Sequence, residues 1–342
     1  MNHVTQLDIA KKLDVTRITV SKALRNHPDI STEMKKRVHE TAEKLGYVPN
    51  LIAKNLTSQK TCTIGLVIPD LENSFFAYIT DSVIDAASER EYNVLVTVSR
   101  ESRENEIQNI QNLIGMRVDG MLVCLTQQSD DSKIFDHVKK IGIPLVFFDR
   151  QIEQLNLSSV VFDDRNGAFS ALDKIIEEGY TKIAHFAGYQ KINIGRERCL
   201  GYKDALSKYN IKINADWILE GGFEVIDGER SFMKLYNENN LPEVILAVND
   251  RVALGIYHAA RKVGINIPED IGIVAFGFNE IAELFAPPLA IINQHPRQMG
   301  KLAMDLLYKE IEHKESSNTQ HVHLKIEEDF YWNNSLKKSD GK

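Results

Sequence analysis

Apolar residues in the first fifty positions recur at spacings of three and four, the pattern of short amphipathic helices. This pattern predicts three helices, over residues 7–13, 16–24 and 31–45. Thr16 and Ser31 suit the position before a helix, because a hydroxyl there accepts a hydrogen bond from an amide of the first turn. Gly46 suits the end of the third helix. Three such helices can close a small core of their own.

The first two predicted helices are joined by a turn so tight that they must cross steeply. Asp14 stands where the backbone needs a left-handed residue, a conformation that aspartate tolerates better than most residues do. This is a helix-turn-helix pattern, whose second helix lies in the major groove of DNA. Base edges would be contacted by Arg17, Ile18, Ser21 and Lys22, and phosphates by the hydroxyls of Thr5, Thr16 and Ser21. Three-helix domains that never bind DNA share this spacing, so the alternative stays open here.

From residue 61 onward, short apolar runs alternate with helical patterns. The predicted strands cover residues 63–68, 94–98, 121–125, 145–148, 160–162, 183–186, 218–219, 244–248 and 271–276. The predicted helices include 75–90, 104–116, 166–178, 197–209, 251–263 and 296–312. This alternation predicts parallel sheets covered by helices on both faces, and the length is too great for one sheet, so we expect two lobes.

Ligands of open α/β sheets bind beyond the carboxyl ends of the strands, so the polar residues there are candidates. They are Asp70, Asn73, Asp149, Asp163, Asp164, Arg198, Asn249, Asp250 and Gln294, with Phe75, Phe76 or Phe278 able to cover an apolar ring face. Carboxylates, an arginine and carboxamides around a cleft suit the vicinal hydroxyls of sugars and nucleosides. Taken singly, an Asp or Asn after a strand often only caps the next helix. Asp163 with Asp164, and Asn249 with Asp250, are open to that interpretation.

The charge of the chain is divided unevenly. The net charge is −7, with 43% apolar and 26% charged residues, which excludes disordered and collagen-like classes. Residues 1–60 nevertheless carry a net +5, and the remainder −12, as in a basic module attached to an acidic body. The three cysteines have no metal-ligand or disulfide spacing, and no signal peptide or spanning segment is evident. We therefore expect a cytoplasmic protein without a cofactor or metal.

The stretch over residues 4–56 resembles the headpiece of the LacI (lactose repressor) family of bacterial transcription regulators. The resemblance is carried by VTxxDIA, by Val20-Ser21-Lys22-Ala23-Leu24, and by Gly46-Tyr47-Val48-Pro49-Asn50 followed by Ala53 and Leu56. It implies a hinge helix, from Asn50 to about residue 58, that lies in the minor groove of DNA. Tyr47, Asn50 and Ala53 would then bind DNA, and Leu56 would insert as a wedge between base steps. The alternative for Leu56 is a leucine of the core.

The same resemblance extends to about residue 335 as a periplasmic-binding-protein-like core. Its motifs are Ile64-Gly65-Leu66-Val67-Ile68-Pro69 with Asn73-Ser74-Phe75-Phe76, Arg198 before Gly201-Tyr202, Ala247-Val248-Asn249-Asp250, and Pro287-Pro288-Leu289 with Gln294. By resemblance, Asp149, Arg198, Asn249 and Gln294 fall where the family holds its effector. One position departs: Gly277 stands where the family carries a carboxylate that faces the pocket. Asn279 or Glu280 could replace that carboxylate.

Together these patterns predict an all-α helix-turn-helix headpiece with a hinge helix, followed by a two-lobed α/β core with parallel sheets. The expected boundaries are 1–48 for the headpiece, 49–60 for the hinge and 61–342 for the core, with one lobe over 61–161 plus 292–320 and the other over 162–291 plus 321–335. The predicted function is a homodimeric repressor that binds a pseudo-palindromic operator and is switched by a small molecule, such as a sugar.

Two other functions fit the same core, namely a sugar-binding transport receptor and an enzyme. No nucleotide-binding or nucleophile motif supports an enzyme. His321 and His323 alternate along a predicted strand and could share a face toward a metal, but no third ligand accompanies them.

Overall fold

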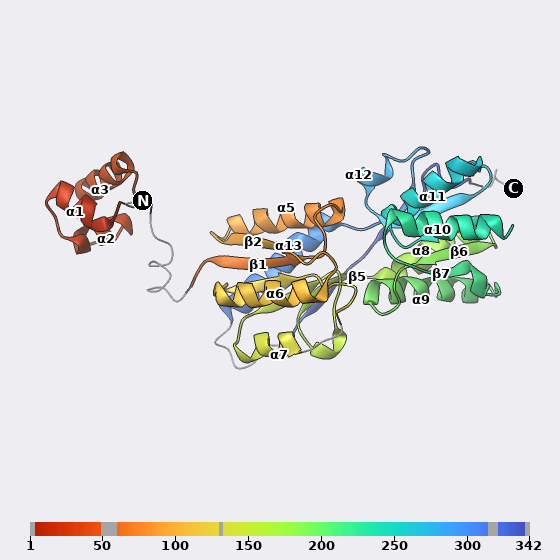
Figure 1. Cartoon of the computed structure of the whole chain (residues 1–342), viewed down its shortest axis with the longest axis horizontal. Helices are drawn as coiled ribbons and strands as arrows, with labels where there is room; N and C mark the ends of the chain where they lie inside the picture. The colour runs from red at the N-terminus through yellow and green to blue at the C-terminus, as the bar shows by residue number, and fades with distance from the viewer. Residues whose placement is uncertain (1–3, 49–59, 130–132, 314–320, 339–342) are drawn as a thin grey trace. The chain divides into compact units, whose positions relative to one another are not determined.

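The computed structural model describes residues 4–48, 60–129, 133–313 and 321–338. Contacts divide the chain into two compact units, residues 1–61 and 62–342 (Figure 1). Among the described residues, no helix has both the length and the apolar character needed to cross a membrane.

Over its described residues the first unit is a bundle of three helices: α1 (Gln6–Leu13), α2 (Arg17–Leu24) and α3 (Thr32–Leu45). Its core is formed by the small or branched side chains of Ile9, Ala10, Val20, Ala23, Val38 and Ala42, all buried. The predicted turn is confirmed, since Asp14 adopts φ 52° and ψ 48°. The predicted caps are confirmed as well. Thr16 and Ser31 accept hydrogen bonds from the backbone N–H groups of Thr19 and Met34.

The second unit contains two six-stranded sheets, one in each lobe. In the first lobe the order is β11-β5-β4-β3-β1-β2, where β1 is Thr63–Ile68, β2 Asn93–Val98, β3 Gly120–Val123, β4 Leu145–Phe148, β5 Ser159–Phe162 and β11 His323–Ile326. In the second lobe the order is β12-β10-β9-β8-β6-β7, where β6 is Ile183–Ala187, β7 Ile218–Glu220, β8 Val244–Ala247, β9 Gly272–Gly277, β10 Ala290–Asn293 and β12 Asp329–Tyr331. All neighbouring strands pair in parallel, except that β10 and β12 pair antiparallel to each other.

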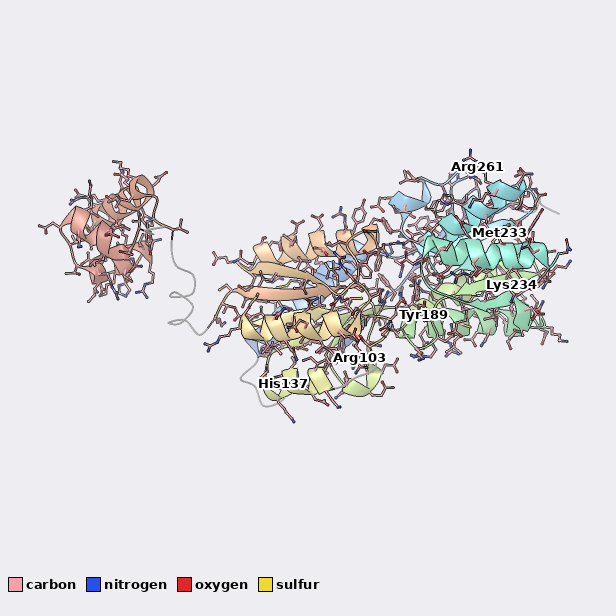
Figure 2. All side chains as sticks on the ribbon, in the orientation of Figure 1. Arg103, His137, Tyr189, Met233, Lys234 and Arg261 are labelled. Atoms are coloured by element: carbon pink, nitrogen blue, oxygen red, sulfur yellow. The ribbon has the colours of Figure 1, made fainter. Side chains whose placement is uncertain are left out.

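Helices cover both faces of each sheet, as the alternating pattern predicts. The first lobe has α5 (Ser74–Ser88) and α13 (Pro296–Glu312) on one face, and α6 (Arg103–Gly115) and α7 (Lys133–Lys140) on the other. The second lobe has α8 (Asp164–Glu177) and α9 (Asn193–Lys208) on one face, and α10 (Val225–Asn237) and α11 (Asp250–Val263) on the other. Lys234 of α10 and Arg261 of α11 lie at the surface (Figure 2), whereas Phe232 of α10 is buried against the sheet. Short helices are η1 (Glu153–Leu155), η2 (Ala215–Trp217) and α12 (Asn279–Ala282).

The chain passes between the lobes at three described places, after β5, after β10 and after β11. One expected boundary is wrong. Residues 321–335 were expected in the second lobe, but β11 pairs in parallel with β5 of the first lobe, with Leu324 opposite Val160. Only β12 joins the second lobe, through β10. The strand pattern of such short segments does not show which sheet each one completes, because both sheets offer an open edge.

Candidate functional site

The first candidate surface is the outer face of α2. Arg17 is exposed, and the side chain of Ile18 is 69% exposed although it is apolar. Ser21 and Lys22 are half-buried, and Lys22 Nζ lies 2.8 Å from Asp29 Oδ2. The geometry therefore leaves Arg17 and Ile18 free of core packing on the helix that the pattern assigns to the major groove.

The other predicted DNA contacts lie around this surface or beyond it. Thr5 donates a hydrogen bond from Oγ1 to Asp8 Oδ2 at 2.7 Å, and so closes the first turn of α1. The Thr16 hydroxyl caps α2, and Tyr47 packs partly against the headpiece core. Asn50, Ala53 and Leu56 lie outside the described residues, so their roles stay predictions.

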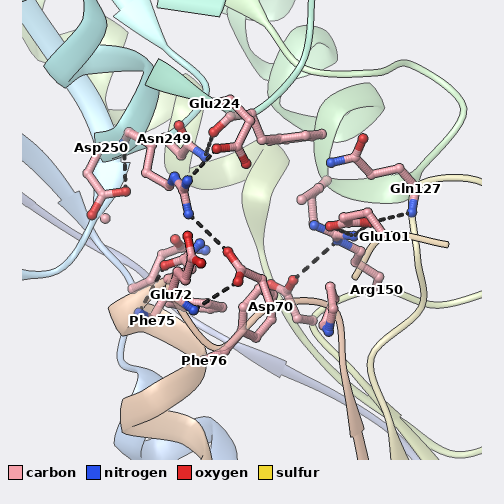
Figure 3. A pocket seen from close by; sticks show the side chains of 18 of the residues that line it. Asp70, Glu72, Phe75, Phe76, Glu101, Gln127, Arg150, Glu224, Asn249 and Asp250 are labelled. Atoms are coloured by element: carbon pink, nitrogen blue, oxygen red, sulfur yellow. Dashed lines mark hydrogen bonds and ion pairs between the residues drawn. The ribbon is translucent and has the colours of Figure 1, made fainter. Parts of the chain in front are cut away.

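The second candidate site is a cavity of about 430 Å³ between the lobes of the core. Ten of the twelve candidates named from the sequence line it, namely Asp70, Asn73, Phe75, Phe76, Asp149, Arg198, Asn249, Asp250, Phe278 and Gln294. The other two, Asp163 and Asp164, do not line it. Most of them follow β1, β4, β8, β9 or β10 or begin the helix beyond the strand, at the carboxyl ends of both sheets, and Arg198 lies in α9, which follows β6. Figure 3 shows Asp70, Phe75 and Phe76 on one side of the cavity and Asn249 and Asp250 on the other. The structure therefore brings residues far apart in the sequence into one pocket.

Arg198 forms the buried centre of this pocket. Its Nε and Nη2 each lie 2.7 Å from Asp164 Oδ1, and its Nη1 donates to the Val248 carbonyl. The guanidinium carbon lies 3.9 Å from the centre of the Phe276 ring. Burial raises the pKa of Asp164 to about 6 despite the opposing charge of Arg198. Asp164 thus pairs with the pocket arginine and is not the helix cap considered from the sequence.

The capping interpretation holds for another candidate. Asn249 Oδ1 accepts a hydrogen bond from the Val252 N–H at 2.8 Å, and its Nδ2 donates to the Phe223 carbonyl at 2.9 Å. Asn249 therefore caps α11 while it also lines the pocket. Asp149 adopts φ 62°, and its side chain is buried, which raises its pKa.

Two ion-pair groups in the pocket were not predicted from the sequence. Arg150 Nη1 lies 2.9 Å from Glu101 Oε1, and both side chains belong to the first lobe. Arg251, at the start of α11, lies 3.0 Å from Asp70 Oδ2 and also pairs with Glu224 (Figure 3). Because Asp70 belongs to the first lobe and Arg251 to the second, this pair crosses the cleft.

The sequence contained a signal that could have identified Arg150 and Arg251, namely their position at strand ends. Arg150 directly follows Asp149, and Arg251 directly follows Asp250, so both stand at strand ends that the sequence had already singled out. Their partners Glu101 and Glu224 also follow strands.

Neither residue considered as a replacement for the missing carboxylate faces the cavity. Gly277 lines it, but Asn279 and Glu280 do not. The backbone N–H of Asn279 donates to Asn293 Oδ1, and Glu280 is exposed on α12. Within the described residues no cluster of His, Cys, Asp or Glu could hold a metal, and His323 Nδ1 lies 2.9 Å from the Ser159 hydroxyl.

A helix-turn-helix unit joined to a two-lobed core with a polar pocket defines a ligand-responsive DNA-binding regulator. Residues 5–50 match bacterial regulatory proteins of the lacI family, and residues 61–333 match the periplasmic binding proteins and sugar binding domain of the LacI family. The chain belongs to the LacI family of bacterial transcription regulators. This membership decides against the transport receptor and the enzyme, because members of this family are transcriptional regulators.

Relatives match over nearly the whole chain. The chain is 31% identical to catabolite control protein A of Priestia megaterium, over 94% of this chain and 96% of that protein. It is 30% identical to the ribose operon repressor of Haemophilus influenzae, over 90% and 92% of the two chains. Its fold is similar to that of the lac repressor dimer bound to operator and the anti-inducer ONPF, with a TM-score of 0.88, 23% identity, and 98% and 100% of the two chains covered.

Proposed function

We propose that this protein is a cytoplasmic repressor that binds a pseudo-palindromic operator as a homodimer. A small molecule in the interlobe pocket raises or lowers its affinity for this operator. The proposal is carried by one observation. A helix with outward Arg17 and Ile18 and a cavity lined from two lobes occur on the same chain. Neither feature serves the stability of its own unit, since Ile18 is apolar yet exposed and the cavity gathers charged side chains.

The basic charge of the headpiece supports DNA binding. Residues 1–60 carry a net +5 on a chain of −7, and phosphate contacts by Lys and Arg supply most of the sequence-independent affinity for DNA. Arg17 can donate to guanine O6 and N7, and Ile18 can pack on a thymine methyl. One headpiece reads only a half-site, so a two-fold dimer matches a pseudo-palindrome.

The geometry of the cavity supports the switch. Its walls come from both lobes, and the Asp70–Arg251 pair joins them across the cleft. An effector that prefers one arrangement of the lobes shifts the equilibrium toward it by no more than its differential affinity. Operator and effector affinities are then linked reciprocally, whichever direction the effector takes.

The DNA part is tested by selecting binding sites from random duplexes with the full chain and then measuring affinity by electrophoretic mobility. We expect a selected pseudo-palindrome of about 14–20 base pairs, and no shift with a chain that lacks residues 1–56. Ile18→Ala should weaken binding to the selected site about 10-fold or more while leaving binding to random DNA unchanged, because a base contact is lost. The control is Lys36→Ala, on the exposed side of α3, which should affect both DNAs equally. Equal losses for Ile18→Ala on both DNAs would contradict the assignment.

The effector part is tested by thermal shift of the full chain against monosaccharides, disaccharides, sugar phosphates and nucleobases. A ligand at 100 times its dissociation constant stabilises the folded state by about 2.7 kcal/mol. A ligand that stabilises the protein should also change the affinity for the selected operator. Stabilisation without any such change would separate ligand binding from regulation and refute the switch.

A further inference from the structure

The lobes of the core are joined by crossover segments that are tied to one another. They are residue 163 between β5 and α8, residues 294–295 between β10 and α13, and residues 327–328 between β11 and β12. The backbone N–H of Asp163 donates to the Ile326 carbonyl at 3.0 Å, which joins the first segment to the start of the last. His295 Nε2 lies 3.1 Å from Asp329 Oδ2 and joins the second to the last. A rearrangement of the lobes must therefore change the surroundings of these segments.

Glu328 turns its side chain inward from the last of these segments, whereas its neighbour Glu327 is exposed. Both carboxyl oxygens of Glu328 are shielded from solvent, and neither has a hydrogen-bond partner among the described residues. They lie against α8 at Gly167, where a β-carbon would overlap Glu328 Oε2 and lie 3.0 Å from its Cδ and 3.2 Å from Ile292 Cγ2. The fold thus buries a carboxyl group without the donors that a charged carboxylate needs.

The charged groups that face Glu328 make its ionisation costly. On the described residues these groups are Asp163 and Asp164 around the start of α8, Arg198 of α9 and Asp149 after β4, while β10 contributes the uncharged Ile292. The one cation, Arg198, lies 2.7 Å from Asp164 Oδ1, so its charge is already compensated. Burial, and then the negative charge of Asp164, raise the pKa of Glu328 well above its ordinary value despite the opposing effect of Arg198.

We propose that Glu328 holds a proton in the lobe arrangement of this structure, and that loss of this proton loosens the crossover segments and shifts the lobes, so that pH changes the affinity for the operator. A charged Glu328 would lie beside Asp164 without a cation of its own, and any arrangement that brings its carboxylate to solvent relieves this repulsion. The present arrangement then binds one proton more than the alternative. Above the midpoint of the Glu328 titration, each pH unit disfavours it by up to about 10-fold. Only the operator part of the inference rests on the proposed function.

The proton is detected by infrared spectroscopy of the full chain at pH 7, because the carbonyl band of a protonated carboxyl group is separate from the bands of a carboxylate. Glu328→Gln should remove part of this band. The matched control is Glu327→Gln, which changes the exposed carboxyl of the same segment and should leave the band as it is. Equal bands in wild type and Glu328→Gln would show that Glu328 is ionised and would overturn the inference.

The effect on the lobes is measured by hydrogen–deuterium exchange of the three crossover segments. Wild type and Glu328→Gln are compared at the same pH, so that the intrinsic exchange rate cancels. We expect equal rates at pH 6, and at pH 8.5 rates at least about 3-fold faster in the wild type, with no difference in the central strands β1 and β8. Glu328→Met, a second variant without an ionisable group, should behave as Glu328→Gln does, and Glu327→Gln as the wild type does. Equal rates at pH 8.5 would refute the loosening.

The link to DNA is tested by mobility shift with the selected operator at pH 6 and pH 8.5 and constant salt. Between these two pH values the operator affinity of the wild type should change at least about 3-fold more than that of Glu328→Gln. The same pH dependence in both proteins would overturn the operator part of the inference. A chain that binds no DNA at either pH would refute the proposed regulator, and the infrared and exchange measurements would still decide whether Glu328 holds a proton and controls the crossover segments.

Discussion

Arg198→Met removes the guanidinium beside Asp164 and keeps an apolar side chain of similar length against Phe276. The pKa of Asp164 is raised by burial to about 6, compared with 3.8 for an exposed aspartate. Stability tied to this carboxyl is therefore fully present below pH 4 and is lost as the pH rises through 6. In the wild type, keeping Asp164 charged at pH 8 costs about 3 kcal/mol.

The variant has no cation to hold the charged form in the core. Asp164 then takes up a proton when the variant folds. This proton uptake costs about 6 kcal/mol at pH 8, whereas at pH 5 it costs no more than the burial of Asp164 costs in the wild type. We expect the difference in the free energy of unfolding between wild type and Arg198→Met to grow by up to about 3 kcal/mol from pH 5 to pH 8. A further loss, independent of pH and of about 1–3 kcal/mol, comes from the Val248 carbonyl that loses its donor.

Urea unfolding at several pH values measures this difference. The chain has two tryptophans, and both Trp217 and Trp332 pack in the second lobe, so their fluorescence reports the lobe that contains Arg198. The control is Arg198→Met/Asp164→Asn, which removes the carboxyl that Arg198 contacts directly but keeps the buried Glu328 and Asp149 nearby, so the loss of stability that grows with pH should be smaller than in Arg198→Met. A difference between wild type and Arg198→Met that is constant from pH 5 to pH 8 would refute the pairing as the reason for the loss.

Three other outcomes follow from contacts in the core. Gly201→Ala should lower the free energy of unfolding by about 2 kcal/mol or more in urea titrations, because a β-carbon there overlaps a backbone carbonyl of α8. The control is Gly115→Ala, because a β-carbon at residue 115 meets open space. Burial lowers the pKa of His185 to about 4, so its contribution to stability is present above pH 6.5 and is lost as the pH falls to 4. His185→Gln should therefore reduce the loss of unfolding free energy between pH 7 and pH 4, measured by urea titration, by about 3 kcal/mol. Arg251→Gln breaks the half-exposed ion pair with Asp70 and should lower the free energy of unfolding by less than about 1 kcal/mol. It should nevertheless widen the distribution of distances between the lobes in small-angle scattering. An unchanged distribution would show that the ion pair does not join the lobes.

Much of the fold follows from local patterns, because each predicted element depends on neighbours in the sequence. The turn at Asp14 and the caps at Thr16 and Ser31 are such local features, and the structure confirms them. The assignment of β11 failed because the choice between two open sheet edges is made by contacts with Ser159 and its neighbours, far away in the chain.

The pocket shows the same division. Residues at strand ends could be named from the sequence, but their partners could not. Arg198 was predicted as a ligand contact, and its pairing with Asp164, 34 positions away, appears only in the structure. Likewise, the motif showed that Gly277 departs from the family, but only the structure shows that the side chains of Ile291 and Asp250 lie next to it. Pairings between distant residues depend on helix positions that no local pattern specifies.

The last strands of the chain have a consequence for its synthesis. Since β11 completes one sheet and β12 the other, a chain emerging from the ribosome can finish neither lobe until residues 323–331 have left the exit tunnel. Until then β5 and β10 each expose an unpaired edge, the kind of surface that recruits strands of other chains. Synthesis that stops before residue 323 would thus leave two incomplete lobes, each with an open sheet edge.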